Sequence, residues 1–480
     1  MAALTAAFML DRVRARDRSF DRAFLFGVKT TGVYCRPSCS ARAANEENIR
    51  FFDTPSAARA AGLRPCLRCR PDEFLAGQDP ELAVVEGVLA RLVADPAAFP
   101  SVDALTAASG FGTTRFHSLV RAHLHTTPAA LLHRERLRRA ADLLLGTRFK
   151  VSDIALEVGY ESHSAFHENF GRTFHLAPGD YRKLSLVPEF QLSLPAGFRP
   201  AETLAFLGRV ADSPSERVAG ATVTKAVQLD DRTARLEISL GAGTARCRIA
   251  APGPLSPVGA RQAHAIALRL LGLVHDPAPF ERKVAERGLG RLVEGRRGLR
   301  IPQSAAVWDG LVWSILGQQV NLAFAFTMWN RLVELAGRDT GDGFRVAPGP
   351  AEVARIDEAD LLARQFSRRK AEYLLGLARA VAAGELDLET LPAGTATRAE
   401  RTLLAQRGLG PWSVQYVLLR ACGFADAVPV GDSGLTTALA RFFELSERPD
   451  PRHTETLMAP FAPYRSFATT HLWHTLEVLG

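Results

Sequence analysis

The sequence predicts a multidomain protein of the mixed α+β class. Its 480 residues exceed what one hydrophobic core usually supports, because domains commonly hold about 100 to 200 residues. Three patterns divide the chain: two close cysteine pairs near the start, a helical segment that recurs after 50 residues, and a later change from period-two to helical spacing of apolar residues. We therefore expect four units: a small α/β domain with the cysteines at 1–79, an all-α double helix-turn-helix domain at 80–185, a small mixed α/β domain at 186–300 and an all-α domain at 301–480.

The composition is that of a globular protein. Hydrophobic residues make up 47% and charged residues 23%, which excludes a largely disordered or collagenous chain. No run approaches the roughly 18 to 20 apolar residues that a membrane span needs. Residues 1–18 alternate apolar and charged side chains and lack the apolar core of a signal peptide. We expect a cytoplasmic protein without a membrane partner.

Basic residues exceed acidic residues along the whole chain. Lys and Arg number 59 and Asp and Glu 51, which gives a net charge of +8. Residues 1–185 hold 25 basic and 20 acidic groups, and the remainder holds 34 and 31. A dispersed excess favours several contact surfaces for a polyanion over a single basic tail. Most of the basic residues are arginine, which suits phosphate binding, although a GC-rich genome would produce the same bias.

Cysteine spacing indicates a metal site. Cys35 and Cys39 form a C-x3-C pair, and Cys66 and Cys69 form a C-x2-C pair after a gap of 26 residues. Two such pairs bring four thiolates to one Zn²⁺ ion at about 2.3 Å. Disulfides are the alternative, and the lack of a secretory signal disfavours them. The spacing leaves open whether the zinc is structural or holds a reactive thiolate.

The residues around these cysteines resemble the Ada methylphosphotriester-repair domain. The resemblance covers about residues 8–75 and rests on the stretches 26–39, which contains C-R-P-S-C, 48–52 and 63–71. It implies that Cys35 is a zinc-bound nucleophile that takes a methyl group from a methylated DNA phosphate in a stoichiometric reaction. Four thiolates on Zn²⁺ carry a net charge of −2, and methylation removes one negative charge from the site that faces DNA, which would strengthen DNA binding. Three arginines are candidate phosphate contacts, with a solvated surface role as the alternative: Arg36, Arg42 and Arg70.

An internal repeat follows the cysteine-containing domain. The motif F-H at 116–117 recurs at 166–167, and H-x-x-P at 125–128 recurs at 175–178, each displaced by 50 residues. Each copy has the pattern helix, glycine turn, helix, which is typical of paired helix-turn-helix motifs whose second helices enter successive major grooves. Residues 80–184 resemble an AraC-type DNA-binding domain. Two side chains of the first recognition helix are candidate DNA contacts: Arg115 and Arg121.

The AraC-type resemblance implies promoter DNA and RNA polymerase as partners. The second unit departs from the family pattern, because Glu168 stands in the turn after Phe166, where a basic residue is usual. A carboxylate near a phosphate would weaken binding by this unit. Nonspecific holding of DNA during repair is the alternative role of the domain.

The pattern changes after residue 188. Apolar residues alternate at 190–194, 222–227 and 234–240, which is the period of half-buried strands. Helical spacing is found at 202–208 and again after Pro257. We expect a small mixed sheet with accompanying helices.

From Pro302 onward the pattern is helical. The stretch R-G-L-G-P-W at 407–412 places Gly408 and Gly410 in a turn whose backbone N–H groups suit one DNA phosphate. Asp432 follows about 20 residues later, after an apolar stretch with Pro and Gly. This order resembles the helix-hairpin-helix DNA glycosylases, and over residues 188–479 the AlkA type, DNA-3-methyladenine glycosylase II. Further stretches carry the resemblance: 315–320, 368–371 and 471–473.

The glycosylase resemblance implies a catalytic centre. Asp432 would stabilise the oxocarbenium character of the sugar and orient or deprotonate water; capping a helix is an alternative role, and one carboxylate can do both. Trp412 stands where strand-cutting relatives carry a Schiff-base lysine, so we expect a monofunctional enzyme that leaves an abasic site. A purine methylated at N3 or N7 is cationic and suits a pocket of aromatic rings. The expected pocket residues are Trp412, Tyr416 and Trp473, with Gln319 filling the gap of the flipped nucleotide and Trp308 and Trp313 in the helical core.

The expected whole is a fusion of a methyl acceptor, a DNA-binding regulator and a glycosylase that acts on alkylated double-stranded DNA. Cys422 stands alone, so we expect one zinc ion, no iron-sulfur cluster and no organic cofactor. The P-C-H-R motif of O6-methylguanine repair is absent, which argues against that activity. The alternative is a methylation-sensing transcription factor whose glycosylase half only binds DNA; the intact Asp432 and hairpin argue against it. We expect a monomer associated with the nucleoid.

Overall fold

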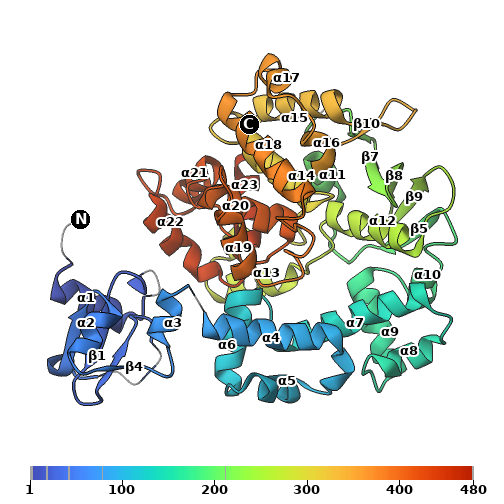
Figure 1. Cartoon of the computed structure of the whole chain (residues 1–480). Coiled ribbons are helices and arrows are strands. Elements are labelled where there is room, and N and C mark those ends of the chain that lie inside the picture. Colours follow the sequence, from blue (N-terminus) through green and yellow to red (C-terminus); the bar gives the residue numbers. More distant parts are fainter. Residues whose placement is uncertain are drawn as a thin grey trace. The chain divides into compact units, whose positions relative to one another are not determined.

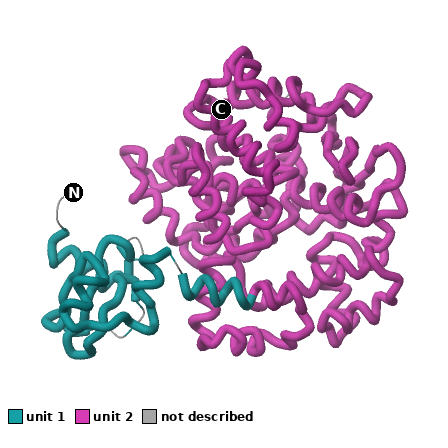
Figure 2. The backbone as a smooth tube through the Cα atoms, viewed as in Figure 1, with its two compact units in different colours: residues 1–88 teal, residues 89–480 magenta. Residues whose placement is uncertain are grey.

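The computed structural model describes residues 4–17, 20–39, 41, 44–77, 79–210 and 212–477. The chain forms two compact units, Met1–Val88 and Leu89–Gly480 (Figure 2). The expected multidomain α+β class is confirmed, because small sheets and all-helical regions alternate along the chain (Figure 1). The four domain boundaries expected from the sequence stay predictions.

The first unit contains a four-stranded sheet in the order β3-β1-β2-β4. Strand β1 pairs antiparallel with β2 and β3, and β2 pairs in parallel with β4. Successive side chains of a strand point to opposite faces, so Phe26 packs with the cysteines while Leu25 packs with Tyr34 and Ala58. The elements are α1 (Ala6–Arg14), β1 (Leu25–Val28), β2 (Val33–Cys35), η2 (Glu46–Asn48), β3 (Ile49–Phe52), α2 (Pro55–Ala60), β4 (Arg64–Pro65) and α3 (Pro71–Leu75).

Two helix-turn-helix units follow, as the repeat predicted. Gly110 and Gly159, with φ of 69° and 88°, lie in the two turns, where the left-handed backbone favours glycine. Each recognition helix, α6 or α9, ends on a left-handed histidine, His125 or His175. The elements are α4 (Pro80–Ala94), η3 (Pro96–Ala98), α5 (Val102–Ser109), α6 (Thr113–Leu124), α7 (Pro128–Gly146), α8 (Val151–Glu157), α9 (His163–Phe174) and α10 (Pro178–Arg182).

A five-stranded antiparallel sheet has the order β5-β9-β8-β7-β6. The three alternating stretches of the sequence form β5, β7 and β8, and the two expected helices form α11 and α12. Strands β6 and β9 were not expected. The elements are β5 (Glu189–Ser193), α11 (Pro200–Leu207), β6 (Glu216–Ala219), β7 (Thr222–Leu229), β8 (Arg232–Leu240), β9 (Thr244–Ala250) and α12 (Pro257–Leu270).

One hydrophobic core joins this sheet to the helices before it. It runs from Leu137 on α7 through Phe166 on α9 to Leu236 on β8 and Leu271 after α12. His264 of α12 also hydrogen-bonds through Nε2 to the carbonyl oxygen of Phe174 at 2.8 Å. The second helix-turn-helix unit and the sheet therefore share buried apolar surface.

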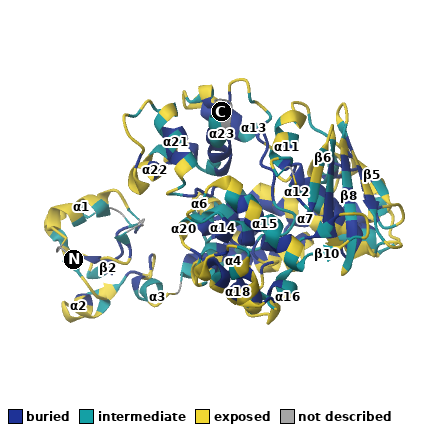
Figure 3. Ribbon diagram, turned by 90° about the horizontal axis from the view of Figure 1, so that it is seen from above, coloured by how far each residue is buried: buried dark blue, intermediate teal, exposed yellow. Residues whose placement is uncertain are grey.

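The last region is helical and has its own core. Helix α14 lies deep in it, with eight of its ten residues buried (Figure 3). None of the helices in the described part of the chain is both long and apolar enough to cross a membrane. The elements are α13 (Ala278–Glu286), η4 (Gly290–Leu292), α14 (Val307–Leu316), α15 (Leu322–Ala336), β10 (Arg338–Asp339), β11 (Arg345–Val346), α16 (Pro350–Val353), α17 (Glu358–Ala363), α18 (Arg368–Ala382), α19 (Ala396–Leu404), α20 (Pro411–Val417), η5 (Leu418–Cys422), α21 (Ser433–Phe442), α22 (Pro451–Met458), η6 (Ala459–Phe461) and α23 (Arg465–Glu477).

Candidate functional site

Four cysteine sulfurs of the first unit converge on one point. Cys35 ends β2, and Cys66 follows β4, so the parallel pairing of these strands brings the two cysteine pairs together. The ligand atoms of Cys35, Cys39, Cys66 and Cys69 all lie within 4.8 Å of one another. Four sulfurs at about 2.3 Å from one ion stand about 3.8 Å apart in a tetrahedron. The cluster therefore fits zinc.

The electrostatics of this cluster also favour a cation. Hydrogen bonds with the sulfurs of Cys39, Cys66 and Cys69, together with burial, raise the pKa of the Cys35 thiol. The hydrogen bond from Cys35 lowers the pKa of Cys66. Four sulfurs so close cannot all carry negative charge unaided, and a divalent cation supplies the missing positive charge.

Arg36 is buried beside the cysteines and does not offer a free guanidinium. It contacts the carboxylate of Asp21 at 3.1 Å and that of Glu81 at 3.7 Å, and it lies over the ring of Phe74. Asp21 also accepts from the backbone N–H and the hydroxyl of Ser38. Arg36 therefore stabilises the turn that carries Cys35 and Cys39, and we do not retain it as a phosphate contact.

The remaining DNA-contact candidates differ in exposure. Arg70 is exposed, has a left-handed backbone with φ of 41° and lies 3.5 Å from Glu73. Arg121 is exposed on α6, whereas Arg115 is partly buried. Arg42 lies outside the described residues. On α9, Glu168 stands where the family pattern has a basic residue. It forms an ion pair with Arg172 one turn later, which offsets its charge.

A second cluster surrounds Asp432 in the other unit. Asp432 is the N-cap of α21, and its Oδ1 accepts from the backbone N–H of Leu435 at 2.7 Å. The indole N–H of Trp412 donates to Oδ2 at 3.0 Å, and that of Trp473 donates to Oδ1 at 2.9 Å. The carboxylate thus caps a helix and is also fixed by two aromatic side chains of α20 and α23.

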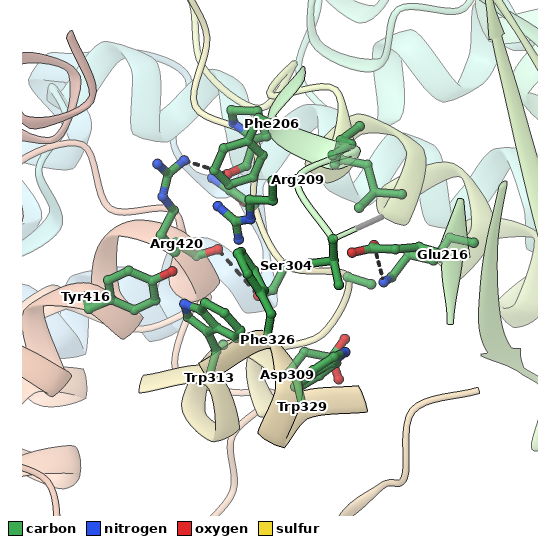
Figure 4. A pocket seen from close by; sticks show the side chains of 18 residues that line it. Phe206, Arg209, Glu216, Ser304, Asp309, Trp313, Phe326, Trp329, Tyr416 and Arg420 are labelled. Carbon is green, nitrogen blue, oxygen red and sulfur yellow. Dashed lines mark hydrogen bonds and ion pairs between the residues drawn. The ribbon is translucent and has the colours of Figure 1, made fainter. Parts of the chain in front are cut away.

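Tyr416 extends this cluster into a cavity. Its ring stacks on Trp412 with centroids 5.6 Å apart and lies 6.5 Å from the ring of Trp473. The cavity, about 90 Å³, continues from Tyr416 between α11 and α14 (Figure 4). The sequence placed Trp412, Tyr416 and Trp473 together, and the structure does bring them around Asp432.

Four aromatic residues that line this cavity are not among the expected pocket residues: Phe206, Trp313, Phe326 and Trp329. Phe206 comes from α11, and Trp313 comes from α14, where we had expected a core residue. Trp308, by contrast, is buried and donates to the carbonyl of Pro348 at 2.9 Å. The signal for Trp313 lies in the sequence, because it falls off the four-residue stripe of apolar pairs that faces the core. Nothing in the local pattern of α11 indicates the role of Phe206.

The hairpin between α19 and α20 is tied to the loop after α14. Gly408 has φ of 94°, and a Cβ there would lie 2.3 Å from the ring of Tyr373. The side-chain amide of Gln318 donates to the carbonyl of Gly408 at 2.9 Å. Gly410 is exposed and is the N-cap of α20. Gln319, next to this amide, is exposed with φ of 55°.

Lys370 also fixes the loop after α14. Its Nζ donates to the carbonyls of Ile315, Leu316 and Gln318 at 2.8, 2.6 and 2.8 Å, which caps the end of α14. Burial lowers the pKa of Lys370 to about 8. Because its donors are engaged by three carbonyls, Lys370 acts as a positioning residue.

Comparison with known proteins assigns the class. Residues 9–72 match the metal binding domain of Ada, residues 105–184 a helix-turn-helix domain, and residues 312–463 the HhH-GPD superfamily of base excision DNA repair proteins. The 3-methyladenine DNA-glycosylase from Archaeoglobus fulgidus has a similar fold, with a TM-score of 0.53 at 19% identity over 61% of this chain and 99% of that one. The folds, the four-cysteine cluster and the cluster around Asp432 define a zinc-binding, DNA-binding repair protein of the helix-hairpin-helix class.

Relatives narrow the class to a family. The "Probable bifunctional transcriptional activator/DNA repair enzyme AlkA" of Mycobacterium tuberculosis is 30% identical over 97% of this chain and 95% of its own length. The bifunctional transcriptional activator/DNA repair enzyme Ada of Escherichia coli is 32% identical over 35% of this chain and 47% of its own. The DNA-3-methyladenine glycosylase of Bacillus subtilis is 34% identical over 37% of this chain and 60% of its own. The chain belongs to the family of bifunctional transcriptional activator/DNA repair enzymes of the AlkA type.

Proposed function

We propose that this protein repairs alkylated DNA by two separate reactions: release of alkylated purines through Asp432 and methyl transfer from DNA methylphosphotriesters to Cys35. The observation that carries the first reaction is the carboxylate of Asp432, held by two indole N–H groups and a helix N-terminus beside an aromatic cavity. A carboxylate that only capped α21 would not need two tryptophan donors from α20 and α23.

Base release requires the C1′–N bond to break with its electron pair leaving on the base. The sugar then develops positive charge at C1′, and the fixed anion of Asp432 stabilises it. Water adds to C1′ and gives its proton to Asp432 or to solvent. The two indoles hold the carboxylate in one orientation, so little reorganisation is needed as charge develops.

The aromatic surroundings favour positively charged bases. A purine alkylated at N3 or N7 carries a positive charge in the nucleotide, and its glycosidic bond is already weakened. Rings such as Tyr416, Trp412 and Trp473 attract such a cation by cation–π interaction, worth about 0.5 to 2 kcal/mol. We infer 3-methyladenine as a representative substrate, extruded from the duplex before it reacts.

Strand cleavage is not part of the proposal. A lyase needs a free amine to form a Schiff base, and Trp412 occupies the position that would carry it. Lys370 is engaged by three carbonyls at the end of α14. We therefore propose a monofunctional glycosylase with an abasic site as product.

Methyl transfer would take place in the first unit. Bound zinc would keep the four sulfurs as thiolates at neutral pH. The Sγ atom of Cys35 forms a bond to the methyl carbon, and the electron pair of the broken C–O bond stays on the phosphate, which becomes an ordinary diester. The product thioether is not reversed by simple exchange, so each protein molecule would react once. Arg70 is exposed near this site and is our candidate phosphate contact.

The helix-turn-helix units support a regulatory role. Arg115 and Arg121 lie on the first recognition helix, α6. On the second recognition helix, α9, the ion pair with Arg172 reduces the repulsion between Glu168 and DNA phosphates. We propose promoter DNA and RNA polymerase as partners, response to Cys35 methylation as the switch, and contact of Gly408, Gly410 and Gln319 with the damaged duplex. A monomer in the cytoplasm, associated with the nucleoid, would meet both kinds of DNA.

Asp432→Asn tests the catalytic proposal. Asparagine keeps the N-cap but lacks the anion, so release of 3-methyladenine or 7-methylguanine from DNA should fall by about two orders of magnitude or more while the fold is retained. Asp450 caps α22 in the same way, with its carboxylate on the N–H of His453 at 2.7 Å, and Asp450→Asn is the matched control that should keep normal activity. Absence of release by the unaltered protein, or undiminished release by Asp432→Asn, would refute the proposal and favour a regulator whose glycosylase half only binds DNA.

A further inference from the structure

An arginine lies against the aromatic walls of the cavity that Tyr416 lines, and Tyr416 in turn contacts the two tryptophans that hold Asp432. The guanidinium carbon of Arg209 is 3.8 Å from the ring centroid of Phe206 and 5.5 Å from those of Trp313 and Phe326. Figure 4 shows its guanidinium between Phe206 on one side and Trp313 with Phe326 on the other. Because Arg209 lines the cavity and is also exposed, it lies where the cavity opens to solvent.

The rings alone hold this guanidinium. Within the described ranges, Arg209 has no hydrogen bond to a carbonyl and no ion pair with a carboxylate, although guanidinium groups usually find such partners. The lysine that lines the cavity, Lys225, is already paired, because its Nζ lies 2.8 Å from the carboxylate of Glu216. Two guanidinium groups of the chain therefore already lie against the ring of Phe206. That of Arg420, 4.5 Å from the ring centroid, is tied to the carbonyl of Pro302, whereas that of Arg209 is held by rings and can leave.

We propose that Arg209 is an internal competitor: its guanidinium occupies the aromatic cavity until a planar, positively charged base from DNA displaces it. This inference rests on the proposed glycosylase function, and it identifies Arg209 as the residue that occupies the base-binding cavity when no base is bound. A cationic purine replaces the cation–π contacts that Arg209 gives up, and charge repulsion drives the guanidinium out into solvent. Every base that enters must first displace Arg209, so brief sampling of undamaged DNA is discouraged.

The sign of one mutational effect tests the proposal. Arg209→Met keeps most of the stem and removes the charge. If Arg209 competes, this variant of the full-length protein binds a planar cation about two- to fivefold more tightly than the unaltered protein, which is the range expected for loss of an exposed cation–π competitor. If Arg209 instead contacts the substrate, the same variant binds more weakly.

The probe is the 3,9-dimethyladeninium cation, with neutral 9-methyladenine as its uncharged counterpart. Binding is followed by tryptophan fluorescence and by calorimetry, neither of which requires catalysis. The matched control is Arg217→Met, because Arg217 is also exposed and lies 5.0 Å from the ring centroid of Phe344 but does not line the cavity. Trp313→Ala removes a wall and should weaken binding of the cation.

Arg209→Met should also bind damaged DNA more tightly. Arg209→Met should lower KM for duplex that contains 7-methylguanine and leave kcat nearly unchanged. Unchanged or weaker cation binding by Arg209→Met, or an equal gain in Arg217→Met, would overturn the inference even if bases are released through Asp432. Tighter cation binding by Arg209→Met without base release by the unaltered protein would support the cavity assignment and refute the proposed function instead.

Discussion

At the residue scale, the candidate active site depends on how Asp432 is held. Three donors converge on its two oxygens: the indoles of Trp412 and Trp473 and the backbone N–H of Leu435. Hydrogen bonds to a charged group are worth about 1.5 to 3 kcal/mol each. The aromatic residues therefore have two roles in our proposal, since their rings face the base and their N–H groups orient the carboxylate.

Trp473→Phe separates these two roles. Phenylalanine keeps an aromatic ring but removes the N–H that donates to Oδ1 of Asp432 at 2.9 Å. We expect kcat for release of alkylated purines to fall by about tenfold or more, with a smaller change in KM, because loss of one charge-assisted donor affects the developing charge more than base stacking. Single-turnover kinetics measure the effect. Trp329→Phe is the control, because Trp329 lines the cavity that Tyr416 also lines and has no hydrogen bond to Asp432; an equal loss in both variants would contradict this role of Trp473.

At the element scale, the sequence predicted the segments of the site better than its walls. The residues at 412, 416 and 432 are close in sequence and come together through one hairpin and one helix start, so local pattern was sufficient. Phe206 lies on α11, more than 200 residues earlier, and reaches the site only through tertiary packing of the sheet region against α14. Arg36 shows the same limit, because its buried partner Asp21 cannot be found from spacing.

The helix-hairpin-helix turn gives a matched pair of glycine variants. Gly408 has φ of 94°, and an added Cβ would meet the ring of Tyr373, whereas Gly410 has φ of −94° and no neighbouring atom within 4 Å. Gly408→Ala should lower the free energy of unfolding by about 1 to 3 kcal/mol through backbone strain alone, and by more through the clash with Tyr373. It should also weaken DNA binding. Gly410→Ala keeps its backbone N–H, so it should change stability and DNA binding little. Thermal unfolding and DNA titration measure the two effects, and equal behaviour of the two variants would show that the hairpin geometry is not what binds the phosphate.

At the scale of the whole molecule, the two proposed reactions lie in separate compact units. In the second unit, the second helix-turn-helix and the sheet share one core, and the residues proposed for base release lie in the same compact unit with a core of their own. The dispersed positive charge of the sequence agrees with several DNA contacts along the chain. The first unit is different, because cysteines make up four of the six residues in its buried cluster with Phe26 and Val28.

Removal of zinc should therefore affect one reaction only. Cysteines make up most of one of the two buried clusters of this unit, so loss of the ion leaves four close sulfurs without the cation that holds them together, and structural zinc contributes about 10 to 16 kcal/mol in small domains. After treatment with a strong chelator, we expect loss of methyl acceptance, with release of 7-methylguanine unchanged because Asp432 lies in the other unit. Mass spectrometry after exposure to methylphosphotriester DNA should find one added methyl on Cys35 in the untreated protein and none after chelation. A methyl on another residue would refute the assignment of Cys35, and loss of base release together with zinc would show that the units depend on each other.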